Sequence, residues 1–290
     1  MAGVPEIHGD CDGRFVAVRD ALVRNFFERG ELGAAVAVIL DGELVVDIWG
    51  GWMDSARTRP WERDTLVDVF SVGKAIAALC VLILVERGQV ELDAPVSRYW
   101  PEFAAGGKAE VTVRTLLSHR AGLPAIRAPL PDLAMYDWEL MSTSLAAQEP
   151  WWEPGSRHGY HVNTFGFLAG EIVRRVTADS IGAFFRDEVS GPLGADFHFG
   201  IGPEDDARTA EYLFGAQSSE FIDGEPERRQ LHPTDEERKQ LLEDDEGRQL
   251  LLARAYFNPA GISGVGTVNT RDWRAAVDRA SQRSWTVLAL

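Results

Sequence analysis

FSVGKAIAALCVLILVERG, residues 70–88, contains the longest apolar run of the chain, Ala75–Val85. This run of eleven residues is too short to span a bilayer, which takes about 20, and it suits a helix buried in a globular core. Gly88 stands where a helix commonly ends on a left-handed residue. The stretch therefore predicts a buried helix over about Ser71–Arg87.

The head of this helix carries a Ser-x-x-Lys pair, Ser71 and Lys74. Three residues apart on a helix, the two side chains lie on one face with about 5–6 Å between Cβ atoms, so hydroxyl and ammonium can meet. A serine hydroxyl is a poor nucleophile until a base removes its proton, and lysine can be that base where burial disfavours its charged form. The helix N-terminus also offers backbone N–H groups to a developing oxyanion. The pair thus indicates a serine nucleophile with a lysine base.

This spacing is uncommon for the composition of the chain. With 14 serines and three lysines in the sequence, chance would give about 0.14 such pairs. A purely structural alternative stays open, in which Ser71 caps the helix and Lys74 extends from the first turn into solvent.

A second candidate element is Gly159–Asn163, which follows a loop rich in Trp, Pro and Gly and precedes an apolar helix. A phenol beside a cationic lysine has a lowered pKa, so Tyr160 and Lys74 could share the general-base task. Each aromatic residue here also has a structural alternative, because a tyrosine at a helix start often only packs and a loop histidine is usually solvated. Further candidates for the lining of a substrate pocket are His161, Asn163, Trp151 and Trp152.

The composition excludes several classes of protein. The chain has 290 residues, 45% hydrophobic and 26% charged, as in ordinary soluble globular proteins. Its 29 Lys and Arg against 45 Asp and Glu give a net charge of −16, which argues against nucleic acid or an anionic membrane as partner. Two cysteines are too few for a disulfide framework, and Cys80 is expected to be a buried, reduced thiol. Met1–Phe15 has no apolar stretch, so the sequence predicts a cytoplasmic protein, and no metal-binding cluster is visible.

Hydrophobic spacing predicts the other elements. Two strands, Ala34–Leu40 and Glu43–Trp49, join through Asp41-Gly42, a strong hairpin signal. Pro203–Gly247 is acidic and polar and is expected to be a solvent-facing insertion or lid. A hairpin followed by a helical block indicates mixed α and β structure. Helices are expected at Asp20–Arg29, Val111–Leu117, Asp137–Ala147, Thr164–Val176 and Ile181–Val189.

Together these segments resemble the serine β-lactamase-like family, which includes class C β-lactamases, D,D-peptidases and cytoplasmic esterases. Phe70–Lys74 is similar to the family's nucleophile motif, and Leu116–Pro124 resembles a structural signature that is not itself catalytic. The resemblance, from about Arg14 to Trp273, implies an α+β fold: an antiparallel sheet flanked by helices plus a mostly helical subdomain. It implies a single domain, 1–290, with its helical part at about 89–200.

The second catalytic motif separates branches of that family. Pro154-Gly155 followed by Tyr160-His161 resembles the esterase-like branch. β-Lactamases have Tyr-x-Asn, whereas here Val162 takes the third position and Asn163 falls one place late. This departure favours an esterase. The resemblance implies catalytic roles for Ser71, Lys74 and Tyr160, and no cofactor.

The third motif, Lys-Thr-Gly or His-x-Gly on a late strand, has no match. From about Ala275 the chain departs from the family, so an atypical tail is expected over about 275–290, with the C-terminal strands absent. Loss of one oxyanion donor typically costs ~10²–10³ in rate.

The leading hypothesis is a carboxylesterase-like serine hydrolase that acts on small esters through a Ser-Lys-Tyr acyl-enzyme mechanism. One alternative keeps the chemistry but takes lactams or peptides, as a β-lactamase or D,D-peptidase. Another is a truncated, non-catalytic homologue. A fourth, an unrelated α/β domain, requires four motifs to coincide by chance. The expected partner is a small-molecule ester or lactam, and the oligomeric state is left open.

Overall fold

The computed structural model describes residues 5–213 and, beyond them, residues 251, 254–255, 258–259, 269–274 and 287–289. The chain divides into two compact units. Unit 1 comprises Met1–Asp68, Glu204–Pro233 and Leu290, and unit 2 comprises Val69–Pro203 and Thr234–Ala289.

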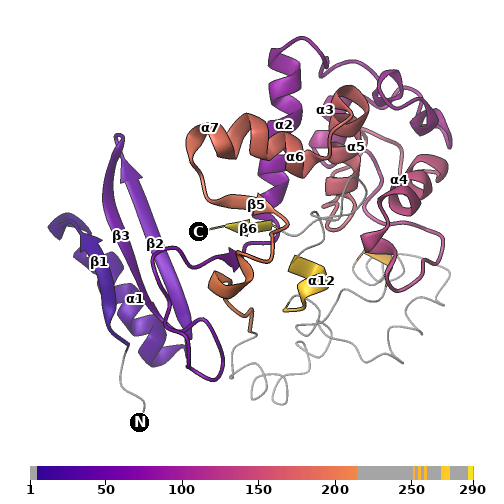
Figure 1. Ribbon diagram of the computed structural model, residues 1–290. Helices are drawn as coiled ribbons and strands as arrows, with labels where there is room; N and C mark the ends of the chain where they lie inside the picture. The colour runs from indigo at the N-terminus through magenta and orange to yellow at the C-terminus, as the bar shows by residue number, and fades with distance from the viewer. Residues whose placement is uncertain are drawn as a thin grey trace. The chain divides into compact units, whose positions relative to one another are not determined.

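Unit 1 is built on an antiparallel sheet in the order β1–β3–β2, with α1 (Val16–Glu28) packed against one face (Figure 1). β2 (Gly33–Leu40) and β3 (Glu43–Gly51) are the predicted hairpin, and the hairpin is confirmed. Its two turn residues both have positive φ, 52° at Asp41 and 86° at Gly42, as a tight turn between twisted strands requires. The core between sheet and helix contains Ile7, Leu22, Val45, Val46 and Ile48.

The sequence did not predict β1 (Ile7–Cys11), which pairs with β3. Its residues IHGDC show no apolar alternation, so pairing with β3 and not local preference makes it a strand. Helix α1 begins at Val16, earlier than predicted, directly after the 3₁₀ turn η1 (Gly13–Phe15), which Asp12 caps.

The start of the predicted acidic insertion also belongs to unit 1. Leu66 N–H donates to the carbonyl of Arg208 in η6 (Asp206–Arg208), and Ala210 N–H donates back to Leu66 (both 2.8 Å). This ladder precedes β4 (Val67–Asp68). Residues 214–247 of the expected lid lie outside the described residues, as does the expected tail except for 287–289.

Unit 2 is organised around α2 (Val72–Glu86), the predicted central helix, which packs along α5 (Phe165–Thr177) (Figure 1). Gly88 follows the helix with φ of 69°, as predicted. Cys80 is fully buried and free, and burial raises the pKa of its thiol to about 12. Burial is one-sided, however, because Leu79 and Leu82 are exposed.

The other predicted helices are confirmed, with ends shifted by a few residues. The helix expected at Ile181–Val189 changes at Phe185 into a π-helical turn. In the described part, β5 (Phe197–Phe199) pairs antiparallel with β6 (Val287–Ala289). No helix there is long and apolar enough to cross a membrane. Further helical elements of unit 2 are η2 (Val96–Arg98), η3 (Pro101–Ala104), α3 (Val113–Leu117), η4 (Ala134–Tyr136), α4 (Trp138–Ala147), α6 (Ile181–Phe185), η5 (Arg186–Ser190), α7 (Gly191–Leu193) and α12 (Arg271–Arg274).

Candidate active site

The start of α2 brings the Ser-x-x-Lys pair together. Ser71 lies at the N-cap position but its side chain makes no capping hydrogen bond. Lys74 Nζ lies 3.1 Å from Ser71 Oγ, so the two side chains form the expected contact. Ser71 is exposed and Lys74 is partly buried. The arrangement therefore differs from the alternative in which the serine caps the helix.

The backbone around the serine leaves one N–H group free. The N–H groups of Val72, Gly73 and Lys74 donate to the carbonyls of the residues three positions earlier, at 3.1–3.2 Å. The Ser71 N–H has no acceptor within the described part of the chain. Phe70, directly before it, has a φ of 45°, a strained value for a bulky residue. A free N–H beside the hydroxyl is a donor that a developing oxyanion can use.

Tyr160 lies beside this pair. Lys74 Nζ is 4.9 Å from the centroid of the Tyr160 ring, within cation–π range. The side chain is 45% exposed. Ser71, Lys74 and Tyr160 thus form a chain of contacts, hydroxyl to amine to aromatic ring.

His119 adjoins the same site, although it was not among the site residues predicted from the sequence. Its ring lies 5.0 Å from that of Tyr160, and its Nδ1 accepts the N–H of His161 at 3.0 Å. Burial, with additional repulsion from Lys74 and His158, lowers the pKa of His119 to about 4. The signal was available, since His119 lies within the Leu116–Pro124 motif, but that motif was interpreted as purely structural.

His161 is completely buried, and its ring lies against the turn formed by residues 119–123. Its Nε2 accepts the N–H of Leu123 at 3.0 Å, which leaves Nδ1 to donate to the carbonyl of Gly159 at 2.5 Å. Burial lowers the pKa of His161 to about 4. Both ring nitrogens are therefore used to hold the backbone on either side of the site.

The other pocket candidates also hold backbone segments. Asn163 Nδ2 donates to the carbonyl of Ala255 (2.9 Å), and Trp151 Nε1 donates to that of Ala125 (2.9 Å). Trp152 packs so closely over Gly159 that a Cβ there would lie 2.3 Å from its ring. The structure thus groups Tyr160 with Ser71 and Lys74, whereas Asn163, Trp151 and Trp152 contact the surrounding loops.

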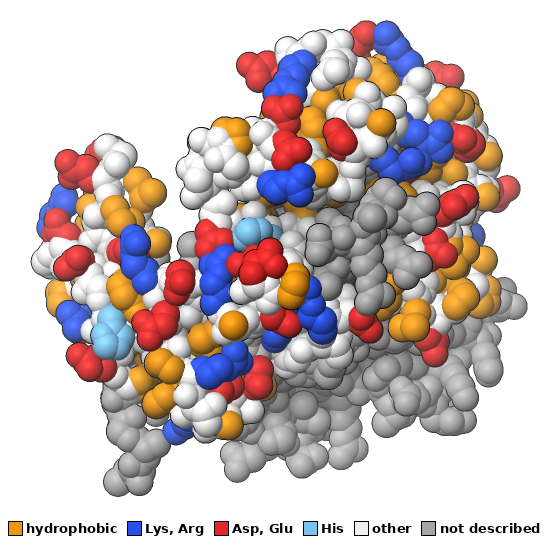
Figure 2. Space-filling model, in the orientation of Figure 1, with side chains coloured by type: hydrophobic (Ala, Val, Ile, Leu, Met, Phe, Trp, Pro, Cys, Tyr) orange, Lys and Arg blue, Asp and Glu red, His pale blue; other side chains and the backbone are white. Residues whose placement is uncertain are grey.

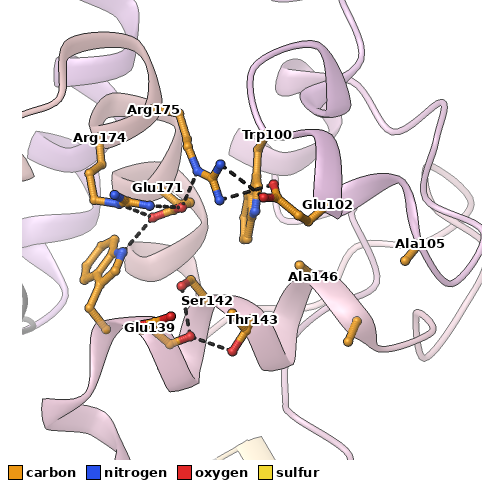
Figure 3. Close-up of a pocket in the computed structure, with 12 residues that line it drawn as sticks. Trp100, Glu102, Ala105, Glu139, Ser142, Thr143, Ala146, Glu171, Arg174 and Arg175 are labelled. Atoms are coloured by element: carbon orange, nitrogen blue, oxygen red, sulfur yellow. Dashed lines mark hydrogen bonds and ion pairs between the residues drawn. The ribbon is translucent and has the colours of Figure 1, made fainter.

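A cavity of about 600 Å³ lies elsewhere in unit 2, lined by residues of η3, α4 and α5 (Figure 3). The buried Glu171 carboxylate accepts hydrogen bonds from Trp138, Arg174 and Arg175 at 2.6–2.7 Å. The hydroxyls of Ser142 and Thr143 both donate to the carbonyl of Glu139. Because its buried carboxylate is already fully bonded and its hydroxyls donate to a backbone carbonyl, this cavity is a weaker candidate for catalysis than the Ser71 site.

The described residues contain no group of three or more His, Cys, Asp and Glu arranged to hold a metal ion. At Ser71 the described residues bring together a hydroxyl, an amine, an aromatic ring and a free backbone N–H.

Comparison with known proteins gives the family. The chain matches the Beta-lactamase family over residues 19–279. This chain belongs to the β-lactamase family. Its helices and antiparallel sheets accordingly form the α+β serine β-lactamase-like fold expected from the resemblance.

Three relatives illustrate the relationship. The curated "Esterase/beta-lactamase LipL" of Mycobacterium tuberculosis is 40% identical over 210 residues, 71% of this chain and 48% of that protein. The crystal structure of a family VIII carboxylesterase is 45% identical with a TM-score of 0.69, covering 72% of this chain and 57% of that one. A penicillin-binding protein homologue from Caulobacter crescentus is 34% identical with a TM-score of 0.77, covering 98% and 68%. This β-lactamase-family chain therefore spans about half the length of the curated relatives it matches.

Proposed function

We propose that this chain is a serine hydrolase that cleaves small carboxylic esters through an acyl-enzyme on Ser71. The contact between Lys74 Nζ and Ser71 Oγ, 3.1 Å, is the observation on which the proposal depends, because an amine at this distance can accept the hydroxyl proton. The names of its relatives, an esterase/β-lactamase and a carboxylesterase, support the same reaction class.

In the proposed reaction Lys74 Nζ accepts the hydroxyl proton as Ser71 Oγ bonds to the ester carbonyl carbon. The carbonyl π electrons move onto oxygen, and the Ser71 N–H donates to that oxyanion. When the C–O bond to the alcohol breaks, the proton held by Lys74, with Tyr160 assisting, passes to the departing alkoxide. Water then attacks the acyl-enzyme by the same steps, releasing the acid and restoring the Ser71 hydroxyl.

An ester is preferred over a lactam as substrate because of Asn163. Asn163 falls one place after the position that Asn takes in the Tyr-x-Asn motif of β-lactamases, and one of its amide N–H groups donates to the Ala255 carbonyl. A β-lactamase or D,D-peptidase activity is the second candidate, favoured by the similarity to the penicillin-binding protein homologue over 98% of this chain.

The test is labelling by a fluorophosphonate, which phosphonylates an activated serine. Purified parent protein should be labelled and Ser71→Ala should not. Ser97→Ala should match the parent, because Ser97 is a half-buried serine whose hydroxyl donates to the Ala109 carbonyl. Lys74→Arg keeps the cation but cannot act as base, so labelling should slow by about 10²–10⁴.

Labelling that persists in Ser71→Ala would refute the proposal. A folded parent protein that shows neither labelling nor hydrolysis of a chromogenic acetate ester would instead support the non-catalytic homologue. Hydrolysis of a chromogenic cephalosporin at rates comparable to the ester would favour the second candidate.

A further inference from the structure

The position of Tyr160 depends on few contacts. Its hydroxyl makes no hydrogen bond within the described part of the chain, and the side chain is 45% exposed. Its ring lies 5.0 Å from the His119 ring and 4.9 Å from Lys74 Nζ. A tyrosine this exposed keeps one rotamer only if its ring is packed, and His119 is the aromatic side chain positioned to pack against it.

His119 itself is held on several sides. The Phe165 ring centroid lies 4.6 Å from that of His119. Phe165 is buried in the core, unlike the exposed Tyr160. The His119 carbonyl accepts the N–H of Gly159 (3.0 Å), and its backbone has a left-handed φ of 59°. The His119 imidazole is therefore held by the core residue Phe165 and by the segment of the chain that carries Tyr160.

One hydrogen bond also fixes the tautomer of His119. Nδ1 accepts the His161 N–H at 3.0 Å, so in the neutral ring the proton resides on Nε2. A proton on Nδ1 would set two donors against each other, and a ring protonated on both nitrogens would carry a positive charge that Lys74 repels. The neutral ring is the state that fits these neighbours.

We propose that His119 is a positioning residue: its neutral imidazole, held in one tautomer by the His161 N–H, keeps the Tyr160 ring beside Lys74. In the proposed mechanism, His119 contacts neither Ser71 nor the reacting atoms, and it acts through Tyr160. The proposal rests on the proposed function for its effect on rate, although the placement of Tyr160 can be measured without any activity.

The test compares His119→Asn with His158→Asn. Asparagine keeps an acceptor near the Nδ1 position and tolerates left-handed backbone, but it has no ring to pack against Tyr160. His158 is an exposed neighbour whose ring centroid lies 5.9 Å from that of His119, so its variant controls for loss of a nearby imidazole.

The first readout is ¹⁹F NMR of protein labelled with 3-fluorotyrosine. The five tyrosines give five signals, and Tyr160→Phe assigns that of Tyr160. His119→Asn should shift the Tyr160 signal towards that of a solvent-exposed fluorotyrosine and leave the others in place, whereas His158→Asn should shift none.

The second readout is ester hydrolysis. Misplacing Tyr160 by about 1 Å should lower kcat by roughly 10²-fold in His119→Asn, with KM changed less than twofold. An unchanged Tyr160 signal or an unchanged kcat would overturn the proposal. If the signal shifts but Ser71 is never labelled by the fluorophosphonate, the positioning role stands and the proposed function fails.

A third measurement needs no variant that must fold. Long-range ¹H–¹⁵N spectra of the parent protein report the tautomer of each histidine, and His119 should carry its proton on Nε2. A proton on Nδ1 would contradict the hydrogen bond from His161 and overturn the proposal.

Discussion

Lys74 and Lys108 have contrasting surroundings within one unit. Lys74 Nζ lies next to a serine hydroxyl, whereas Lys108 is completely buried and donates to the carbonyls of Ala105, Ala146 and Gln148. Burial lowers the pKa of Lys108 to about 8, opposed by the charge of Glu149. All three donors of Lys108 serve the backbone, so a perturbed lysine here indicates a structural clamp and not a base.

Glu171 is the second buried charge whose role depends on its partners. Burial by itself raises the pKa of this carboxyl, but hydrogen bonds from Arg174, Arg175 and Trp138 outweigh it, so the net pKa is lowered. Figure 3 shows the two guanidinium groups and the indole converging on the carboxylate. A lowered folded-state pKa stabilises the fold above pH about 4.5, and that contribution is lost as the pH falls further.

We therefore expect Glu171→Gln to lower the free energy of unfolding by about 3 kcal/mol at pH 7, because two arginines lose their shared carboxylate. The deficit should shrink below pH 4.5, as urea unfolding at several pH values would show. Glu102→Gln is the matched control: that exposed carboxylate pairs with Arg175 at 3.2 Å and should cost less than about 1 kcal/mol. Equal losses in both variants would contradict the role of burial.

At the scale of elements, the turn 119–123 is bonded to the segment 151–164 at several points. Trp151 N–H donates to the Gly122 carbonyl (2.7 Å), and Thr164 Oγ1 donates to that of Leu123 (2.6 Å). His161 adds a further bond to the turn, because its Nε2 accepts the Leu123 N–H, while its Nδ1 bonds to Gly159 within its own segment. These bonds join the turn to the segment that carries Tyr160.

The buried histidines should make this connection sensitive to acid. Burial lowers the pKa of His161 to about 4, so the unfolded chain takes up its proton first, near pH 6.5. The neutral His161 ring contributes about 3 kcal/mol to the free energy of unfolding above pH 6.5. This contribution is lost as the pH falls from 6.5 towards 4. His161→Gln should be less stable at pH 7 but show a flatter pH dependence between 6.5 and 4, measured by urea unfolding. The exposed His158→Gln should retain the parent's curve, and a parent curve that is flat over this window would disprove the expectation.

Two glycines offer a matched test of the turn. Gly88 and Gly122 have similar φ values, 69° and 75°, but a Cβ on Gly88 meets nothing within 4 Å, while on Gly122 it would lie 2.6 Å from the Trp152 carbonyl oxygen. Gly88→Ala should cost about 1 kcal/mol from backbone strain alone. Gly122→Ala should cost about 3 kcal/mol or more because the segment must also move. Only Gly122→Ala should slow fluorophosphonate labelling of Ser71, and equal labelling of both variants would show that the turn does not support the site.

Local pattern accounts for what the sequence could predict about elements. The Asp41-Gly42 hairpin, α2 and α5 each follow from turn residues or apolar spacing within a short window. The strand β1 could not be predicted because its pairing with β3 and not its composition defines it. His119 was missed because the Leu116–Pro124 motif that contains it was interpreted as structural. Its partners Tyr160, His161 and Phe165 lie about forty residues further along the chain, so local pattern did not connect them.

At the scale of the whole molecule, two larger cores hold the described part of the fold, with a smaller cluster of Met53, Trp61 and Ala210 in unit 1. One core joins α1 to the sheet of unit 1, and the other surrounds α2 and α5 in unit 2. The sequence predicted the family through motifs that all lie in unit 2, because the reactive residues cluster at the start of α2 and before α5. It could not predict which of the candidate pocket residues face the serine, since the side chains of His161, Asn163 and Trp151 are bonded to backbone carbonyl or N–H groups of distant segments.

Net charge is the property that belongs to the whole chain. Acidic and basic side chains are interspersed on the face in Figure 2, and exposed pairs such as Arg98–Glu91 and Arg114–Asp93 are short, at 2.8 and 2.7 Å. Each such pair contributes about 1 kcal/mol or less and weakens with salt. The excess of −16 opposes the compact state by self-repulsion, which salt also weakens.

Self-repulsion should outweigh the exposed pairs, because 16 uncompensated charges act over the whole surface while each pair acts locally. Raising NaCl from 10 to 200 mM, concentrations that bracket a Debye length of about 10 Å, should therefore raise the midpoint of thermal unfolding by several degrees, equivalent to about 1 kcal/mol. Choline chloride should give the same increase, since screening does not depend on the cation, whereas an increase with NaCl alone would indicate a specific sodium site. A midpoint that falls with both salts would mean that the paired charges, and not the net charge, dominate the electrostatic free energy of this fold.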